Sequence, residues 1–159
     1  MPIFARIATL SFAVLAGCVA VTPNETQPRP AGFVVAPAPA FQKQINGERG
    51  RHRAPALSYS ARLTAAARGH ASDMATNSFF AHVGSDGSDL GDRVRAQGYR
   101  FCWVAENISV GRDSSGEVFA AWMDSPPHRV NMLADEATEF GLARAAGNNW
   151  VLVLARPGC

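Results

Sequence analysis

Five prolines between residues 23 and 39 divide this chain into parts with different capacities to fold. Proline fixes its own φ angle and has no N–H, so such a segment forms neither a helix interior nor a central strand. A proline-rich segment acts instead as a semi-rigid spacer. Residues 18–40 are therefore expected to be a Pro/Ala-rich linker. Residues 41–159, about 120 in number, are long enough for one domain with one core.

The residues before the linker resemble an export signal. Arg6 gives a minimal positive region, and residues 7–16 are apolar but too few to span a bilayer. The following Leu15-Ala16-Gly17-Cys18 resembles a bacterial lipobox. That resemblance implies that residues 1–17 are a lipoprotein signal peptide and that Cys18 carries the lipid, which makes the membrane a partner. An ordinary secretory signal is the alternative.

The residue after the lipidated cysteine bears on the choice of membrane. Val19 stands there instead of an aspartate. By the sorting pattern of lipoproteins in Gram-negative bacteria, this favours the outer membrane, facing the periplasm. Two or more acyl chains would anchor the protein firmly.

The chain has three cysteines, an odd number for an exported protein. If Cys18 carries lipid, Cys102 and Cys159 remain as one pair, and an oxidising compartment favours a disulfide between them. In the chain-entropy model such a bond is worth roughly 4 kcal/mol. Two reduced, buried cysteines are the alternative.

Hydrophobic periodicity and capping signals predict helices followed by strands. Helices are expected at residues 41–48, 61–77, 90–97 and 114–124, with a further helical turn that starts at Ser125-Pro126. Residues 139–145 and 150–154 flank Gly147-Asn148-Asn149 and are typical of a hairpin, and segments 101–104 and 108–110 can add strand. The predicted fold class is α+β, with helices packed on a mainly antiparallel sheet.

Several function classes lack support in the sequence. The formal net charge is only +2, and the one basic cluster (Arg49, Arg51, His52 and Arg53) is typical of a solvated loop and has no nucleic-acid motif beside it. No nucleic-acid partner is therefore expected. The chain has no Gly-x-Ser-x-Gly elbow, HExxH pair or phosphate loop.

Three residues stand out as candidates for a site: His82, Glu106 and His128. Imidazole and carboxylate bind divalent metals and move protons near neutral pH. Taken singly, each would be unremarkable. His70 lies on the apolar stripe of the helix at 61–77 and is expected to be a core histidine.

The order of several short motifs resembles one family. Residues 41–159 are similar to the bacterial branch of the CAP superfamily, which includes cysteine-rich secretory, antigen 5 and pathogenesis-related proteins. The motifs that carry the resemblance are Phe80-Ala-His82, Ala105-Glu-Asn-Ile108, Trp122-Met-Asp-Ser125, Pro127-His-Arg129 and Glu139-Phe-Gly141. The resemblance implies a three-layer α-β-α sandwich.

The family's central cleft typically holds two His and two Glu. By resemblance, His82 and His128 correspond to the histidines and Glu106 to the first glutamate. The second glutamate is replaced by Ser125, so a complete four-residue zinc site is not expected. Two histidines and one carboxylate can still hold a divalent metal such as zinc, or form a metal-free cluster that braces the cleft.

Three functions remain open, because a fold does not fix a function. The leading hypothesis is a lipid-anchored module that binds a metal, lipid or envelope ligand in the cleft. The second is a metal-assisted hydrolase in which His82 and His128 hold the ion and Glu106 is the base. The third is a structural envelope module. An enzyme is the less favoured interpretation.

Overall fold

A computed structural model describes residues 38–158. The expected signal peptide, the expected lipidation site at Cys18 and nearly all of the expected linker lie outside these residues, as does Cys159. The expected disulfide therefore stays a prediction, although the strand register places Phe101, the neighbour of Cys102, opposite Pro157. Within residues 38–158, no helix has the length and apolar character needed to cross a bilayer.

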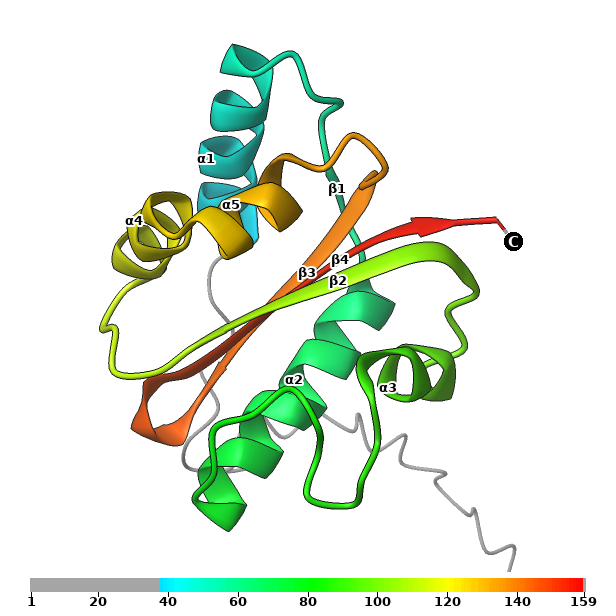
Figure 1. Cartoon of the computed structure of the whole chain (residues 1–159), viewed down its shortest axis with the longest axis vertical. Coiled ribbons are helices and arrows are strands. Elements are labelled where there is room, and N and C mark those ends of the chain that lie inside the picture. Colours follow the sequence, from blue (N-terminus) through cyan, green and yellow to red (C-terminus); the bar gives the residue numbers. More distant parts are fainter. Residues whose placement is uncertain (1–37, 159) are drawn as a thin grey trace, which may run out of the picture.

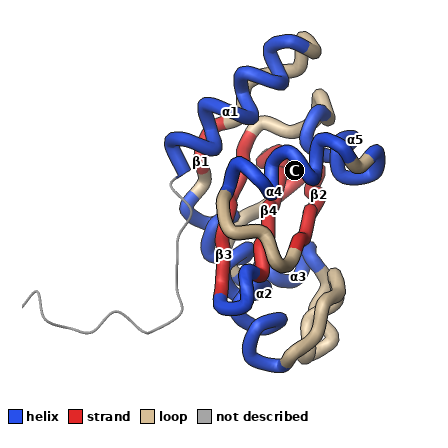
Figure 2. Tube along the Cα trace, turned by 90° about the vertical axis from the view of Figure 1, so that its left-hand side faces the viewer, coloured by secondary structure: helices blue, strands red, loops and turns tan. Residues whose placement is uncertain are grey.

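The described chain forms five α-helices and four strands, shown in Figure 1. In chain order these are α1 (Ala38–Arg51), β1 (Ser58–Tyr59), α2 (Ala61–Asn77), α3 (Leu90–Ala96), β2 (Phe101–Ser109), α4 (Ser115–Asp124), α5 (Pro126–Leu133), β3 (Glu139–Ala145) and β4 (Asn149–Pro157), with a 3₁₀ turn η1 (Ala146–Asn148) between the last two strands. Figure 2 shows the strands side by side in the middle of the molecule with helices around them.

The sheet has the strand order β1-β3-β4-β2 and is mixed. β3 pairs antiparallel with β4, and β4 pairs antiparallel with β2, whereas the two-residue β1 is parallel to β3. β2 is therefore an edge strand. The predicted α+β class is confirmed, with a sheet that is antiparallel except at β1.

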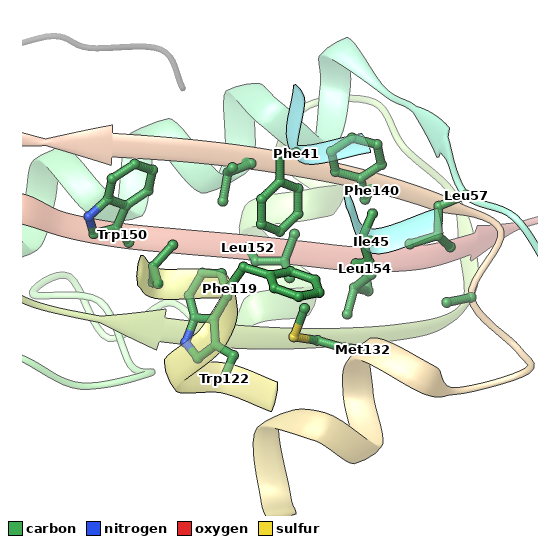
Figure 3. Packing of buried hydrophobic residues seen from close by; sticks show 13 residues of the cluster. Phe41, Ile45, Leu57, Phe119, Trp122, Met132, Phe140, Trp150, Leu152 and Leu154 are labelled. Atoms are coloured by element: carbon green, nitrogen blue, oxygen red, sulfur yellow. The ribbon is translucent and has the colours of Figure 1, made fainter. Parts of the chain in front are cut away.

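Helices cover both faces of the sheet, which gives the three-layer sandwich. Side chains of a strand alternate between faces, so β4 contributes Leu152 and Leu154 to one core cluster and Val151 and Val153 to the other. The first cluster joins the sheet to α1, α4 and α5 and contains Phe41, Phe119 and Trp122, as Figure 3 shows. The second joins the sheet to α2 and α3.

Close packing of α2 on β3 depends on one glycine. A Cβ atom on Gly141 would meet main-chain atoms of Leu63 and Thr64. Neither of those atoms belongs to a flexible side chain that can move aside. The absence of a side chain at Gly141 therefore sets the distance between this helix and the sheet.

Most predicted elements are confirmed, with some changes at their ends. α2 has the predicted bounds, and the 139–154 hairpin is present. The two short segments around residue 105 form one continuous strand, β2. α1 starts three residues before the expected domain boundary, because Pro39 lies in its first turn, where the missing N–H has no cost.

The prediction of a solvated basic loop is wrong for Arg49. This side chain is fully buried, and it donates hydrogen bonds to the carbonyl oxygens of Pro55, Met132, Ala134 and Ala137. Three of these bonds tie the end of α1 to the last turn of α5 and to the segment that follows it. Burial lowers the pKa of the guanidinium from its ordinary value, an effect that the charge of Asp135 opposes.

Candidate functional site

Glu106 is a buried carboxylate on the edge strand. Its side chain is 2% exposed. Val104, Glu106 and Ile108 are every second residue of β2, so their side chains point to the same face of the sheet. Val104 and Ile108 pack in the core cluster under α2 and α3, and Glu106 therefore points toward these helices too. A charge in such a position is costly unless it is paired and hydrogen-bonded.

Arg93 supplies the pairing charge. One of its nitrogens, Nη2, lies 3.2 Å from Oε1 and 3.0 Å from Oε2 of Glu106. The guanidinium also donates to the carbonyl oxygens of Ser88 and His82, at 2.9 and 3.0 Å. Arg93 thus joins α3, the loop at residues 78–89 and β2. Its side chain is 11% exposed, so solvent weakens this pair little.

His82 lies in the 78–89 loop and completes the group around the carboxylate. Its Nδ1 is 2.9 Å from Glu106 Oε1. A carboxylate only accepts hydrogen bonds, so Nδ1 carries the proton and the other ring nitrogen, Nε2, is left for other partners. The His82 side chain is 58% exposed, so this nitrogen is on the solvent side of the group.

His70 lies beneath these residues on α2 and is fully buried. Its Nε2 donates to the carbonyl oxygen of Ala81, at 2.9 Å, and lies 3.9 Å from Glu106 Oε1. Its Nδ1 is buried and has no hydrogen-bond partner among the described residues. Burial lowers the pKa of His70, although the charge of Glu106 opposes this. The prediction of a core histidine is confirmed, and the residue supports the loop that carries His82.

His128 reaches the site from the opposite layer. It lies on α5, and its Nδ1 is 2.8 Å from Ser125 Oγ. Its main-chain oxygen accepts a hydrogen bond from Asn107, whose own side-chain oxygen accepts one from Asn131. The buried Asn107 therefore fixes α5 against β2. Burial first, and the charge of His82 second, lower the pKa of His128 from its ordinary value.

The structure thus brings the three predicted residues to one stretch of β2. Glu106 contacts His82 directly, while His128 approaches from the α5 side. Sequence reasoning missed Arg93 and Asn107. A glutamate inside a strand with Val104 and Ile108 does signal that a buried cation is needed, but periodicity cannot say which arginine supplies it.

These residues do not fit a zinc site in which all three bind the ion directly. Both carboxylate oxygens of Glu106 accept hydrogen bonds from Arg93, and one of them also accepts from His82. A guanidinium thus already lies where a metal cation would have to approach. Across residues 38–158, no group of three or more His, Cys, Asp or Glu side chains is arranged to hold a metal ion.

Comparison with known proteins shows which family this sequence matches. Residues 42–154 match the sequence model of CAP, the Cysteine-rich secretory protein family. The uncharacterized protein YkwD of Bacillus subtilis is 28% identical over 116 residues, which cover 70% of this chain and 45% of YkwD. The uncharacterized membrane protein YlbC of the same organism is 29% identical over 105 residues, 64% of this chain and 30% of YlbC. The chain spans less than half the length of either relative.

Solved structures share the fold. An extracellular protein of Bacillus anthracis that contains an SCP domain superposes with a TM-score of 0.68 at 27% identity, covering 74% of this chain and 41% of that one. An outer surface protein of Borrelia burgdorferi superposes with a TM-score of 0.67 at 17% identity, covering 79% of this chain and 99% of that one. At that identity the second likeness shows the fold alone.

Proposed function

Because this chain belongs to the CAP, or Cysteine-rich secretory protein, family, we propose that it is a lipid-anchored envelope protein that binds a ligand beside His82 and His128. The site lies along the edge of β2. The ligand is a component of the cell envelope, and the protein acts by binding it.

One observation carries this proposal: both imidazoles are held at Nδ1. Glu106 holds His82, and Ser125 holds His128. No hydrogen bond within residues 38–158 uses the Nε2 atom of either ring. Two oriented rings with free nitrogens, supported from different layers of the sandwich, form a preorganised recognition site.

The location rests on other observations. Cys18 stands in a lipobox-like sequence. The relative from Bacillus anthracis is described as extracellular, and YlbC is described as a membrane protein. These descriptions support export and attachment to the envelope for this chain.

The hydrolase alternative has less support. A general base must accept a proton from water within hydrogen-bond reach. The oxygens of Glu106 already accept from Arg93 and His82, and its side chain is almost inaccessible. Three of its roughly four lone-pair sites are occupied, and a side chain that is 2% exposed gives a water little access to the fourth.

Cosedimentation with isolated envelope material tests the proposal. The probes are purified peptidoglycan sacculi and outer-membrane vesicles, and the protein is the full chain with Cys18→Ser, so that no acyl chain causes sedimentation. We expect one probe to bind the protein and the His82→Ala/His128→Ala variant to lose at least about tenfold in affinity, since oriented polar contacts are removed.

His52→Ala is the matched control. His52 is also an exposed histidine, with its side chain 51% exposed, but it lies at the end of α1 and contacts Glu48. This variant should bind like the parent. Equal binding by the parent and the double variant, with both folded, would refute the proposed site.

A further inference from the structure

The edge of β2 offers main-chain hydrogen-bonding groups. In an antiparallel pair, alternate residues direct both N–H and C=O toward the partner strand. In β4, Ala155 pairs with β3 and its oxygen accepts from Thr138, so Leu154 and Leu152 face β2. Their partners in β2 are Ala105 and Asn107. The main-chain groups of Val104, Glu106 and Ile108 consequently face away from the sheet.

A side-chain contact confirms this assignment at one end. The indole N–H of Trp122 on α4 donates to the carbonyl oxygen of Ile108, at 3.1 Å. This bond occupies the edge at Ile108. At the other end the register shifts between Phe101 and Trp103, which breaks the ladder. The free part of the edge is therefore short and centred on Val104 and Glu106.

The main-chain groups of Val104 and Glu106 lack partners. No hydrogen bond within residues 38–158 uses their outward N–H or C=O groups. Glu106 as a whole is 7% exposed, but its side chain is only 2% exposed. Because the whole residue is more exposed than its side chain, the solvent-exposed surface of Glu106 belongs mainly to its main-chain atoms.

The charges beside this edge are balanced. Arg93 is paired with Glu106, and burial lowers the pKa of His128 and so favours its neutral form. The charges of Arg93 and Glu106 therefore compensate each other and leave little net charge from this pair to attract a phosphate or sulfate. It offers alternating N–H and C=O groups between two imidazoles, which complement a neutral polypeptide main chain.

We propose that an extended peptide binds this site as an added strand, pairing its main chain with Val104 and Glu106 between His82 and His128. The inference deepens the proposed function, on which it rests, by assigning the ligand to the peptides. The ladder is short because Trp122 and the register shift limit it. Main-chain hydrogen bonds to only two residues bind a peptide weakly, and we expect contacts with the His82 and His128 rings to strengthen the binding.

Hydrogen exchange measured by NMR tests this assignment. The probe is a library of acetylated, amidated hexapeptides, and the tightest binder from it is added to the full chain carrying Cys18→Ser. The amides of Val104 and Glu106 should exchange at least about tenfold more slowly with the peptide bound, because they become hydrogen-bonded. The Ala105 amide, already paired with β4, is the internal control and should change little.

Val104→Pro is the variant that isolates the edge. It removes one outward N–H without removing a bond to β4, a position where edge strands tolerate proline. It should weaken peptide binding about tenfold, as expected for a lost hydrogen bond and a distorted edge. A thermal melt checks its fold, and methylation of alternate peptide nitrogens gives the same test without changing the protein.

The possible outcomes separate this inference from the proposed function. Peptide binding that leaves both amides unprotected, or no hexapeptide binder with a Kd below about 1 mM, overturns the added strand. If envelope material still binds in a His82- and His128-dependent way, the proposed function stands alone. Protection of both amides without peptide, lost on dilution, would assign the edge to a second copy of this chain and also overturn the inference.

Discussion

At the scale of single residues, one arginine decides what the candidate site can do. Arg93 neutralises Glu106 inside the protein and holds the His82 loop through a main-chain oxygen. The carboxylate therefore acts as a brace for the imidazole. Of the two alternatives for the site, this arrangement favours the metal-free cluster, which we propose and test below.

Replacing Arg93 should be costly. Arg93→Met leaves the buried carboxylate of Glu106 without its partner, and we expect the free energy of unfolding to fall by about 3–5 kcal/mol. Urea denaturation measures this. The matched control is Arg100→Met, because Arg100 is exposed. A change equally small in both variants would show that the pair does not stabilise the fold.

His70 should make stability depend on pH. Burial lowers its pKa in the folded protein, so below the ordinary value of 6.5 the unfolded chain takes up a proton that the folded one resists. Stability should therefore fall as the pH drops from about 7.5 to about 5, with His128 contributing in the same direction. Urea denaturation at several pH values should show a smaller decrease for His70→Gln. An identical pH dependence would exclude His70 as a cause.

The same scale shows where sequence reasoning fails. Arg49 and Arg51 lie in one basic cluster, yet Arg49 is buried against four carbonyl oxygens, while the side chain of Arg51 is 74% exposed. The carbonyl oxygens that bind Arg49 come mainly from residues 132–137, far along the chain. Only the tertiary fold brings them there, so no local pattern distinguishes the two arginines.

At the scale of elements, the sequence predicted helices and strands best where the hydrophobic period and the capping or turn residues indicated the same element. The apolar stripe predicted α2, and the turn signals around Gly147 predicted the hairpin of β3 and β4. β1 has only two residues and both are exposed, so it left no pattern. It pairs with β3 through main-chain hydrogen bonds and one ring contact, between Tyr59 and Phe140. Two residues are too few to show a strand period, which explains why the parallel pair was not foreseen.

The packing of α2 on β3 can be tested at one glycine. Gly141→Ala puts a Cβ against main-chain atoms of Leu63 and Thr64, and overpacking of this kind should reduce stability by about 2–3 kcal/mol. Thermal and urea unfolding measure it. Gly69→Ala, in the same helix with open space around it, should instead stabilise by up to about 1 kcal/mol. A tolerated Gly141→Ala would contradict the close approach.

At the scale of the whole molecule, the proposed function requires an anchor joined to a binding domain. The anchor was inferred from residues 1–40, and its evidence is the sequence around Cys18 and Val19. If residues 18–40 form the expected linker, ligand binding and membrane attachment should be independent properties of one chain. The three-layer sandwich was expected by family resemblance, and the structure confirms it.

Metabolic labelling tests the anchor. In a Gram-negative host, the full chain should incorporate radioactive palmitate and fractionate with the outer membrane. Cys18→Ser should lose the label and leave the membrane fraction, since its acyl chains are absent. Val19→Asp should keep the label and move to the inner membrane. Label that persists in Cys18→Ser would exclude Cys18 as the lipidated residue.

The central claim is that Glu106 braces His82 together with Arg93 and is neither a metal ligand nor a base. Calorimetric titration with zinc, comparing the full chain carrying Cys18→Ser with the same chain carrying Glu106→Gln, tests it most directly. Circular dichroism first establishes that both are folded. The glutamine oxygen can still accept from His82 Nδ1 but lacks the charge of a metal ligand or a base, so we expect at most a modest change in zinc affinity. Loss of a supporting partner weakens metal binding by about 10–100-fold. Micromolar binding of one zinc ion that is abolished in Glu106→Gln, beyond such a weakening, would contradict the claim.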